Sequence, residues 1–238
     1  MDFKSHLKKY LKDEEIEKLC ESLLDKPTHA VILNERKMSD ELFVSLFPNV
    51  IPHPIVKHAY IYDRDEYDLG KSIYHLLGCF YIQEPSAMIP AYLLNANEDD
   101  IVLDYCAAPG GKSIQTSFLM NNKGLIISND LSKARCYDML ENIERLGIGN
   151  IVLLNNDLTK IDDKFQCYFD KIILDAPCSG SGMFRKDERL IKDWTYQKVL
   201  KNAALQKELI LSAYKMLKND GVMVYSTCSF SYEENEEV

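Results

Sequence analysis

From residue 101 onward, short apolar runs alternate with longer amphipathic segments, and this pattern leaves few folds open to the chain. Strands are expected at 101–105, 125–130, 151–154, 171–175 and 222–226. Helices are expected from about Lys112, from Ser132 to Leu146, and over 195–217 before a turn at Asn219–Gly221. Apolar strands separated by helices predict a parallel sheet covered on both faces, whose ligands bind beyond the carboxyl ends of the strands. The sequence therefore predicts an α/β fold with a Rossmann-like sheet.

The first 80 residues lack this regular alternation. Helices are expected at 3–10 and 14–24 and from Ser39, and strands at 30–33 and 59–62. We therefore expect a small N-terminal α+β domain over 1–80, whose candidate role depends on the motifs described below, and a second domain over 81–238. The acidic residues 233–238 resemble the first turn of a helix. The second domain is accordingly expected to be truncated at its C-terminus.

Composition excludes several classes of protein. No apolar run approaches the roughly 18–20 residues of a membrane helix, and the charged N-terminus does not resemble a signal peptide. The seven cysteines are expected to be free thiols in the cytoplasm, and their spacing predicts no metal site. The net charge of −9 opposes binding of nucleic acid by bulk electrostatics, so any RNA contact needs a local basic face, an added domain or a preassembled ribonucleoprotein.

The segment Asp104–Ser113 follows the first predicted strand and contains two adjacent glycines. A phosphate-binding loop would need glycine at the position of Cys106, so that interpretation fails. Asp130 lies 20 residues after Gly110, the spacing of a carboxylate that binds ribose hydroxyls, and Asp157 follows the third strand. One such aspartate alone would be a loop cap, but acids at three strand ends predict a nucleoside site. Their charge suits a cationic sulfonium better than a triphosphate.

Two cysteines follow the last two predicted strands. Cys178 lies in Asp175-Ala-Pro-Cys-Ser-Gly180, and Cys228 lies in Ser226-Thr-Cys-Ser229. A lone cysteine is usually inert packing. Two at neighbouring strand ends, each beside small hydroxyl residues, indicate shared chemistry.

These motifs together resemble a known family. Cys106–Lys112, Asp175–Gly180 and Ser226–Ser229, with Tyr81–Met88 before them, are similar to the RsmB/RsmF/NSUN family of RNA 5-methylcytosine methyltransferases, closest to its bacterial RsmF-like branch. The resemblance covers 80–238 and, more loosely, 1–80, whose candidate role is RNA binding. It implies a class I fold that uses S-adenosylmethionine. It also implies methylation of carbon 5 of cytosine in RNA, with 16S ribosomal RNA favoured over tRNA, through a covalent cysteine adduct at carbon 6.

The resemblance also implies a role for each matched residue. Cys228 would be the nucleophile, Cys178 would assist product release, and Asp175 would lie between cofactor and base. Asp130 would hold the ribose and Asp157 would lie by the adenine. Lys112 is a weaker candidate for lowering a thiol pKa or positioning Asp175. The cofactor's methionine part would be wrapped by Cys106, Ala107, Ala108, Pro109, Gly110, Gly111 and Lys112.

Alternatives stay open at this point. In DNA cytosine methyltransferases the Pro-Cys cysteine attacks, which would make Cys178 the nucleophile. The acidic charge also allows a non-catalytic ribosome assembly factor that binds cofactor or RNA, and a monomer is the default. Residues 183–186 are either an RNA contact with an aromatic platform or a solvated loop, and Trp194 is expected in the core. The cysteines expected to pack are Cys20, Cys79, Cys136 and Cys167.

Overall fold

The computed structural model describes residues 2–187 and 189–238. Its contacts divide the chain into two compact units. The larger unit consists of Thr28–Leu174 and Ala213–Val224. The smaller unit is assembled from Met1–Pro27, Asp175–Ser212 and Tyr225–Val238. This division follows spatial contacts and does not test the predicted domain boundary at residue 80, which stays a prediction.

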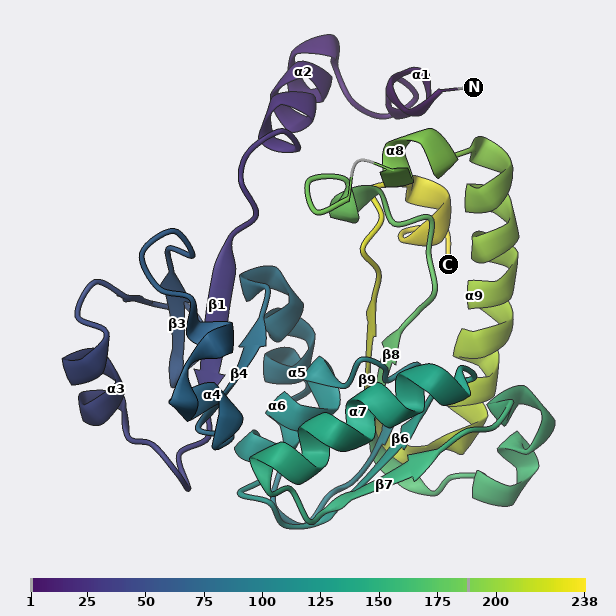
Figure 1. Cartoon of the computed structure of the whole chain (residues 1–238). Coiled ribbons are helices and arrows are strands. Elements are labelled where there is room, and N and C mark those ends of the chain that lie inside the picture. Colours follow the sequence, from purple (N-terminus) through teal and green to yellow (C-terminus); the bar gives the residue numbers. More distant parts are fainter. Residues whose placement is uncertain (1, 188) are drawn as a thin grey trace. The chain divides into compact units, whose positions relative to one another are not determined.

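The larger unit contains the predicted Rossmann-like sheet, with the strand order β7-β6-β5-β8-β9 (Figure 1). The pairs β5–β6, β6–β7 and β5–β8 are parallel. Fully buried Val102, Ile126 and Ile173 form the centre of the core. The predicted fold class is therefore confirmed. The strands are β5 (Ile101–Asp104), β6 (Leu125–Asn129), β7 (Ile151–Leu154), β8 (Phe169–Asp175) and β9 (Leu217–Ser226).

The helices of this sheet begin and end where local chemistry predicts. The Ser132 hydroxyl accepts a hydrogen bond from the Arg135 amide at the start of α7 (Lys133–Leu146). The helix ends at Gly147, whose φ of +72° suits glycine. Helix α6 (Gly111–Leu119) follows Gly110, which has φ +101°. The cap prediction for α7 is thus confirmed.

A second, antiparallel sheet has the order β2-β3-β1-β4. The predicted strands at 30–33 and 59–62 correspond to β1 and β3, and the Ser39 hydroxyl caps α3 as predicted. Phe43 and Phe80 are fully buried in the core of this sheet. The strands are β1 (His29–Leu33), β2 (Ile51–Pro52), β3 (Ala59–Tyr62) and β4 (Phe80–Gln83), and the helices are α3 (Asp40–Leu46), α4 (Ile73–Leu76) and α5 (Ile89–Leu94).

The smaller unit is helical, with an aromatic core. The ring of Phe3 lies 5.0 Å from that of Phe184 and 5.4 Å from that of Trp194. The prediction of Trp194 as a core residue is confirmed, whereas Phe184, only 2% exposed, cannot be an aromatic platform for RNA. The helices are α1 (Phe3–Leu7), α2 (Asp13–Ser22), α8 (Arg189–Asp193) and α9 (Tyr196–Met216), the last of which continues into the larger unit.

Two local predictions are wrong. The expected turn at Asn219–Gly221 is strand, because β9 begins directly after α9 at Leu217. Lys218 forms an ion pair with Asp170 at 2.6 Å, and a Cβ on Gly221 would lie 2.9 Å from the Asp170 carbonyl, so β9 runs close to β8 from its start. Cys167 is exposed at a φ of +51°, so it does not pack in the core.

Within the described part of the chain, no helix is both long and apolar enough to cross a membrane.

Replacing Gly78 by alanine should lower the free energy of unfolding by about 3 kcal/mol, because strain and a steric clash add together. Gly78 has φ +70°, and its Cβ would lie 2.1 Å from the Arg145 carbonyl oxygen. Gly147 is a matched control, because its φ is +72° but its Cβ would meet only the Lys37 side chain at 3.6 Å. Gly147→Ala should cost about 1 kcal/mol. Urea unfolding of both variants measures the difference, and equal losses would contradict it.

Candidate active site

The glycine-containing turn after β5 is held against the next strand. The Ala107 amide donates to the Asn129 carbonyl at 2.7 Å, and the Ala108 amide donates to Asp130 Oδ2 at 3.2 Å. A Cβ on Gly110 would lie 2.7 Å from Met139 Cγ, so this position requires glycine for space as well as for its φ. Because α6 begins at the end of this turn, its first backbone amides lie beside the loop.

Asp130 is the predicted acid that directly contacts this loop. It is 6% exposed, and its Oδ1 accepts from the Ser132 amide at 2.8 Å. Its Oδ2, besides accepting from Ala108, lies 3.3 Å from Arg135 Nη1. Arg135 also donates to the Ala108 carbonyl, a contact that sequence analysis missed because an arginine in a first helical turn carries no pattern. The Asp130 carboxylate therefore links the loop to the first turn of α7 by hydrogen bonds and an ion pair.

Asp157 follows β7, beside the end of β6. The Asn156 amide donates to Asn129 Oδ1 at 3.0 Å, which joins the turns after the two strands. Hydrogen bonds from Thr159 and Lys160 hold the pKa of the Asp157 carboxyl below its usual value, so it is ionised at neutral pH. The larger unit thus carries the glycine loop, Asp130 and Asp157 at neighbouring strand ends, as expected of a nucleoside site.

Cys178 and Cys228 lie together in the smaller unit. Their Sγ atoms are 3.1 Å apart, with Cys228 exposed and Cys178 partly buried. The Ala176 amide donates to the Ser226 carbonyl at 2.9 Å, and the Gly182 amide donates to the Cys228 carbonyl at 2.8 Å. These bonds join the turns after β8 and β9, so the two predicted cysteines form one site.

Burial and neighbouring groups at this site raise the pKa values of Cys178 and Tyr225. The hydrogen bond with Cys228, together with burial, raises the pKa of Cys178 far above its ordinary value. Asp175 Oδ1 accepts from the Ser226 hydroxyl at 2.8 Å. Burial and the nearby Glu234 raise the pKa of Tyr225, whose hydroxyl donates to the Glu234 carbonyl at 2.6 Å. Cys178 and Tyr225 therefore keep their protons at neutral pH.

The predicted site residues fall into both units. Residues 106–112, Asp130 and Asp157 belong to the larger unit, and Asp175, Cys178 and Cys228 belong to the smaller one. Lys112 and Asp175 lie in different units, so the predicted influence of Lys112 on Asp175 or a thiol stays a prediction.

The acidic residues near the end of the chain are predicted to form the first turn of a helix. Tyr232–Glu234 forms a single 3-10 turn, and Glu234 is fully buried. Its carboxylate turns inward, where the Ser179 amide and hydroxyl donate to it. Sequence analysis missed this contact because a run of glutamates is usually solvated. The only available signal was the position of Glu234, six residues after Cys228.

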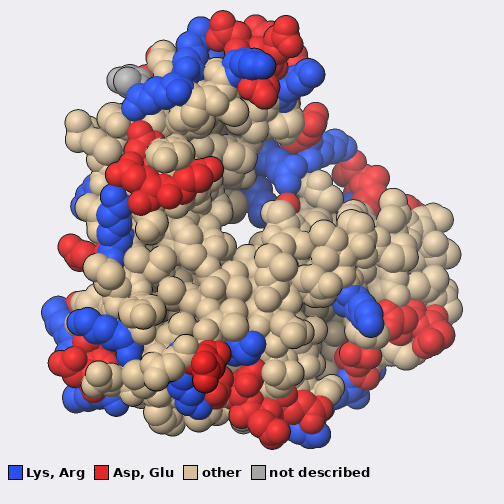
Figure 2. All heavy atoms as spheres, turned by 180° about the vertical axis from the view of Figure 1, so that it is seen from behind, with Lys and Arg blue, Asp and Glu red and all other residues tan. Residues whose placement is uncertain are grey.

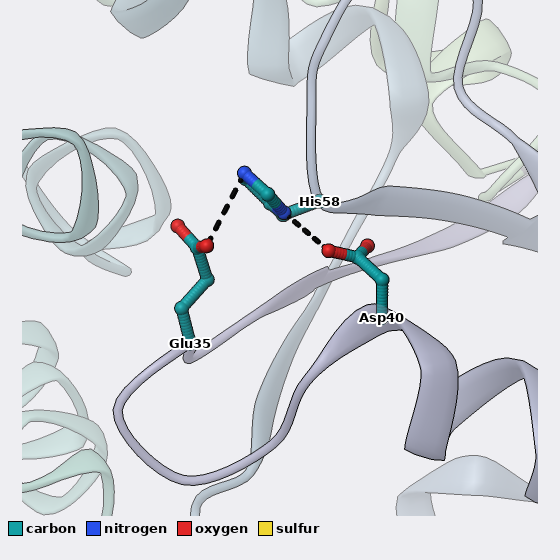
Figure 3. A group of neighbouring side chains, drawn as sticks. All are labelled: Glu35, Asp40 and His58. Carbon is teal, nitrogen blue, oxygen red and sulfur yellow. Dashed lines mark hydrogen bonds and ion pairs between the residues drawn. The ribbon is translucent and has the colours of Figure 1, made fainter.

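A separate group of titratable side chains lies in the antiparallel sheet. His58 Nδ1 faces Asp40 Oδ2 at 2.5 Å, and His58 Nε2 faces Glu35 Oε1 at 3.3 Å (Figure 3). Among the described residues, these three are close enough to hold a metal ion together. However, both ring nitrogens already face carboxylates within the group. The group therefore links Glu35 and Asp40, at the start of α3, to His58, the residue before β3.

On the face drawn in Figure 2, side chains of one charge do not gather into a single patch. Figure 2 shows acidic and basic side chains interspersed among larger uncharged areas on the face that it draws. This agrees with the net negative charge, which the predicted RNA partner would have to overcome locally.

Comparison with protein families identifies these motifs. Residues 91–238 match the family model described as 16S rRNA methyltransferase RsmB/F. The chain belongs to the RsmB/F family. Residues 1–85 match the N-terminal domain of 16S rRNA methyltransferase RsmF, so both parts of this RsmB/F chain point to the same branch.

Named relatives agree with this membership. The RsmB/F chain is 46% identical over 178 residues to ribosomal RNA small subunit methyltransferase F of Vibrio vulnificus (strain YJ016), which covers 74% of this chain and 38% of the relative. It is 41% identical over 217 residues to the protein of that name from Vibrio campbellii, covering 88% of this chain and 45% of the relative. The chain thus spans less than half the length of these curated relatives.

Solved structures share the fold over nearly the whole chain. NSun6 from Pyrococcus horikoshii, solved with SFG, has a TM-score of 0.90 at 25% identity and covers 99% of this chain and 85% of that one. A methyltransferase homologue from Pyrococcus horikoshii has a TM-score of 0.85 at 32% identity, covering 95% and 73%. The fold of this RsmB/F chain is therefore that of known methyltransferases.

Proposed function

We propose that this chain is the catalytic part of an S-adenosylmethionine-dependent methyltransferase that forms 5-methylcytosine in 16S ribosomal RNA in the cytoplasm. The observation that carries the proposal is the 3.1 Å separation of Cys178 Sγ and Cys228 Sγ at adjoining turns. Methyl transfer to oxygen or nitrogen needs no thiol, whereas carbon 5 of cytosine needs covalent activation. Membership of the RsmB/F family and the names of its relatives support ribosomal RNA as the substrate.

Cys228 is the proposed nucleophile. Its thiolate adds to carbon 6 of the cytosine ring, and the displaced π electrons make carbon 5 an enamine carbon. The cofactor supplies a methyl group on a cationic sulfur, which such a carbon can attack. Loss of the proton from carbon 5 then returns the electrons and expels Cys228 as a thiolate. Exposure of Cys228 supports this role, because the attacking sulfur must reach the base.

Cys178 is proposed to assist release. Cys228 is the exposed member of the pair, so a thiolate is better solvated there than at the partly buried Cys178. The Cys178 thiol then donates to the Cys228 sulfur and stabilises it as nucleophile and leaving group. Once Cys228 is bound to the base, Cys178 loses this partner; it then gives up its own proton to solvent and, as a thiolate, accepts the carbon 5 proton. Asp175 is proposed to stabilise the charge that develops at ring nitrogen 3.

The cofactor is proposed to bind at the ends of β5, β6 and β7. The backbone of Cys106–Lys112 would hold its methionine part, Asp130 its ribose and Asp157 its adenine. The contact between Ala108 and Asp130 supports this assignment, because it sets the carboxylate against the loop that would enclose the ligand. The solved relative with SFG, an analogue of S-adenosylmethionine, adds support from the family.

Asp130→Asn should weaken S-adenosylmethionine binding by about tenfold or more, because an amide accepts ribose hydroxyls less strongly than a carboxylate. Isothermal titration calorimetry measures this loss without relying on activity. Asp138→Asn is the control, since it removes the same charge from an exposed position on α7 and should leave the affinity unchanged. Equal affinities in both variants would remove Asp130 from the cofactor site.

The proposed function is tested by transfer of tritiated methyl groups from S-adenosylmethionine to unmodified 16S ribosomal RNA, naked or in small subunits. Label is expected in cytosine carbon 5, with one position protected in bisulfite sequencing. Label in tRNA alone would move the substrate to the tRNA branch. Cofactor or RNA binding without any transfer would support the non-catalytic assembly factor and overturn the proposal.

A further inference from the structure

The buried Glu234 carboxylate contacts both cysteine turns. Its Oε1 accepts from the Ser179 amide at 2.6 Å, and its Oε2 accepts from the Ser179 hydroxyl at 2.6 Å and from the Ser229 hydroxyl. The two hydroxyl oxygens lie 3.0 Å apart. Ser179 directly follows Cys178 and Ser229 directly follows Cys228. One charged group therefore holds the residue after each cysteine.

Asn235 secures the Thr-Cys-Ser turn from the other side. Its Oδ1 accepts from the Thr227 hydroxyl at 2.6 Å, and its Nδ2 donates to the Ser229 carbonyl at 3.0 Å. The backbone of Glu234 and Asn235 is itself held in place, because the Tyr225 hydroxyl donates to the Glu234 carbonyl. Cys228 is thus flanked by two residues that both hydrogen-bond to the adjacent 234–235 pair.

The chemistry of a buried carboxylate makes this arrangement specific. A carboxylate can only accept, and burying one is costly unless donors surround it. The Ser179 amide and the Ser179 and Ser229 hydroxyls can all donate to it, and hydrogen bonds to an ionised acceptor are about twice as strong as neutral ones. A glutamine would turn an N–H group toward these donors. The site therefore selects glutamate over its neutral isostere.

We propose that Glu234 is a positioning residue, which sets the separation of the Cys178 and Cys228 sulfur atoms by holding Ser179 and Ser229 together. Asn235 fixes the remaining side of the Cys228 turn. Glu234 touches no reacting atom and acts only through the two cysteines. The inference rests on the proposed function for its kinetic consequence, but the geometric consequence stands without it.

The geometric test compares Glu234→Gln with Glu236→Gln, which makes the same charge change at an exposed position two residues away. The readout is the rate at which limiting hydrogen peroxide converts the Cys178–Cys228 pair into a disulfide, at a temperature where both variants are folded by circular dichroism. Glu234→Gln should slow this by about tenfold or more, and Glu236→Gln should match the wild type. A wild-type rate in folded Glu234→Gln overturns the proposal, as does a wild-type pair that does not oxidise.

The kinetic test uses the same variants on RNA. Glu234→Gln should lower kcat for methyl transfer by about a hundredfold, with KM for RNA nearly unchanged, because misplaced thiols slow chemistry and not binding. A role confined to stability would lower Tm and leave kcat of the folded protein unchanged. If the wild type transfers no methyl group, the proposed function fails, and the disulfide measurement still decides the role of Glu234.

A second pair of variants covers the case in which Glu234→Gln does not fold. Ser229→Ala removes one of the three donors, whereas Ser229→Thr keeps the hydroxyl. Ser229→Ala should slow disulfide formation severalfold, and Ser229→Thr should restore most of the rate. Equal rates in these two folded variants would overturn the proposal.

Discussion

Cys228→Ser should lower methyl transfer to RNA by at least about a thousandfold, because a serine hydroxyl is not ionised at neutral pH and cannot add to carbon 6. Cys178→Ala should have a different phenotype. Addition and methylation can proceed in it, but release is impaired, so a protein–RNA adduct should accumulate and survive denaturing electrophoresis. Radiolabelled RNA and labelled cofactor report the two effects in one experiment.

The contrast between these variants carries more information than either loss alone. Cys20→Ser, which removes a partly buried thiol from α2 in the same unit, should behave as the wild type. If Cys228→Ser traps the adduct and Cys178→Ala abolishes it, Cys178 is the nucleophile, as in the DNA enzymes. The greater exposure of Cys228 argues against that outcome, because the attacking sulfur must reach the base.

Mild oxidation should join Cys178 and Cys228 and abolish methyl transfer until a reductant is added. One thiol is oxidised by hydrogen peroxide to a sulfenic acid with release of water, and the second thiol displaces a further water to form the disulfide. Their sulfur atoms lie 3.1 Å apart and need to approach to about 2.05 Å. The reaction should quicken as pH rises, because attack requires a thiolate.

Counting thiols measures this result. All seven cysteines are free, so the oxidised protein should lose two thiols and keep five, and Cys178→Ser should form no such bridge. Peptide mapping should find the bridge between 178 and 228 only. Bridges to Cys20 or to the exposed Cys167 at a similar rate would contradict the separation that the structure gives.

Local sequence patterns predicted the parallel sheet and the proximity of the two cysteines. Uniformly apolar strands, Ser132 and Gly147 as helix caps, and cysteines at strand ends all follow rules that act within a few residues. The strand ends in a parallel sheet share one edge, so the proximity of Cys178 and Cys228 followed from topology. The match of 91–238 to a family model agrees with those motifs.

The missed features depend on contacts between distant segments. The position of Glu234, six residues after Cys228, does not indicate that its carboxylate meets Ser179, 55 residues earlier. Phe184 is buried because Phe3, from the first helix, packs on it. The strand at Leu217 begins early because Asp170 attracts Lys218. Pairings of this kind override local propensity and have no local pattern by which to be predicted.

The smaller unit is assembled from distant segments of the chain, and this affects how it folds during synthesis. Lys9 and Tyr196 both bind Glu233, and Tyr10 binds the Phe230 carbonyl, so the first helices depend on residues more than 200 positions later. At synthesis rates of about 5–20 residues per second, that stretch takes roughly 10–45 s to make. The fully buried His6, whose Nε2 lies 3.2 Å from Glu233 Oε2, is made that long before this partner exists. Residues 3–10 can pack only after the segment that they contact has been made, so their apolar side chains are exposed in the nascent chain meanwhile.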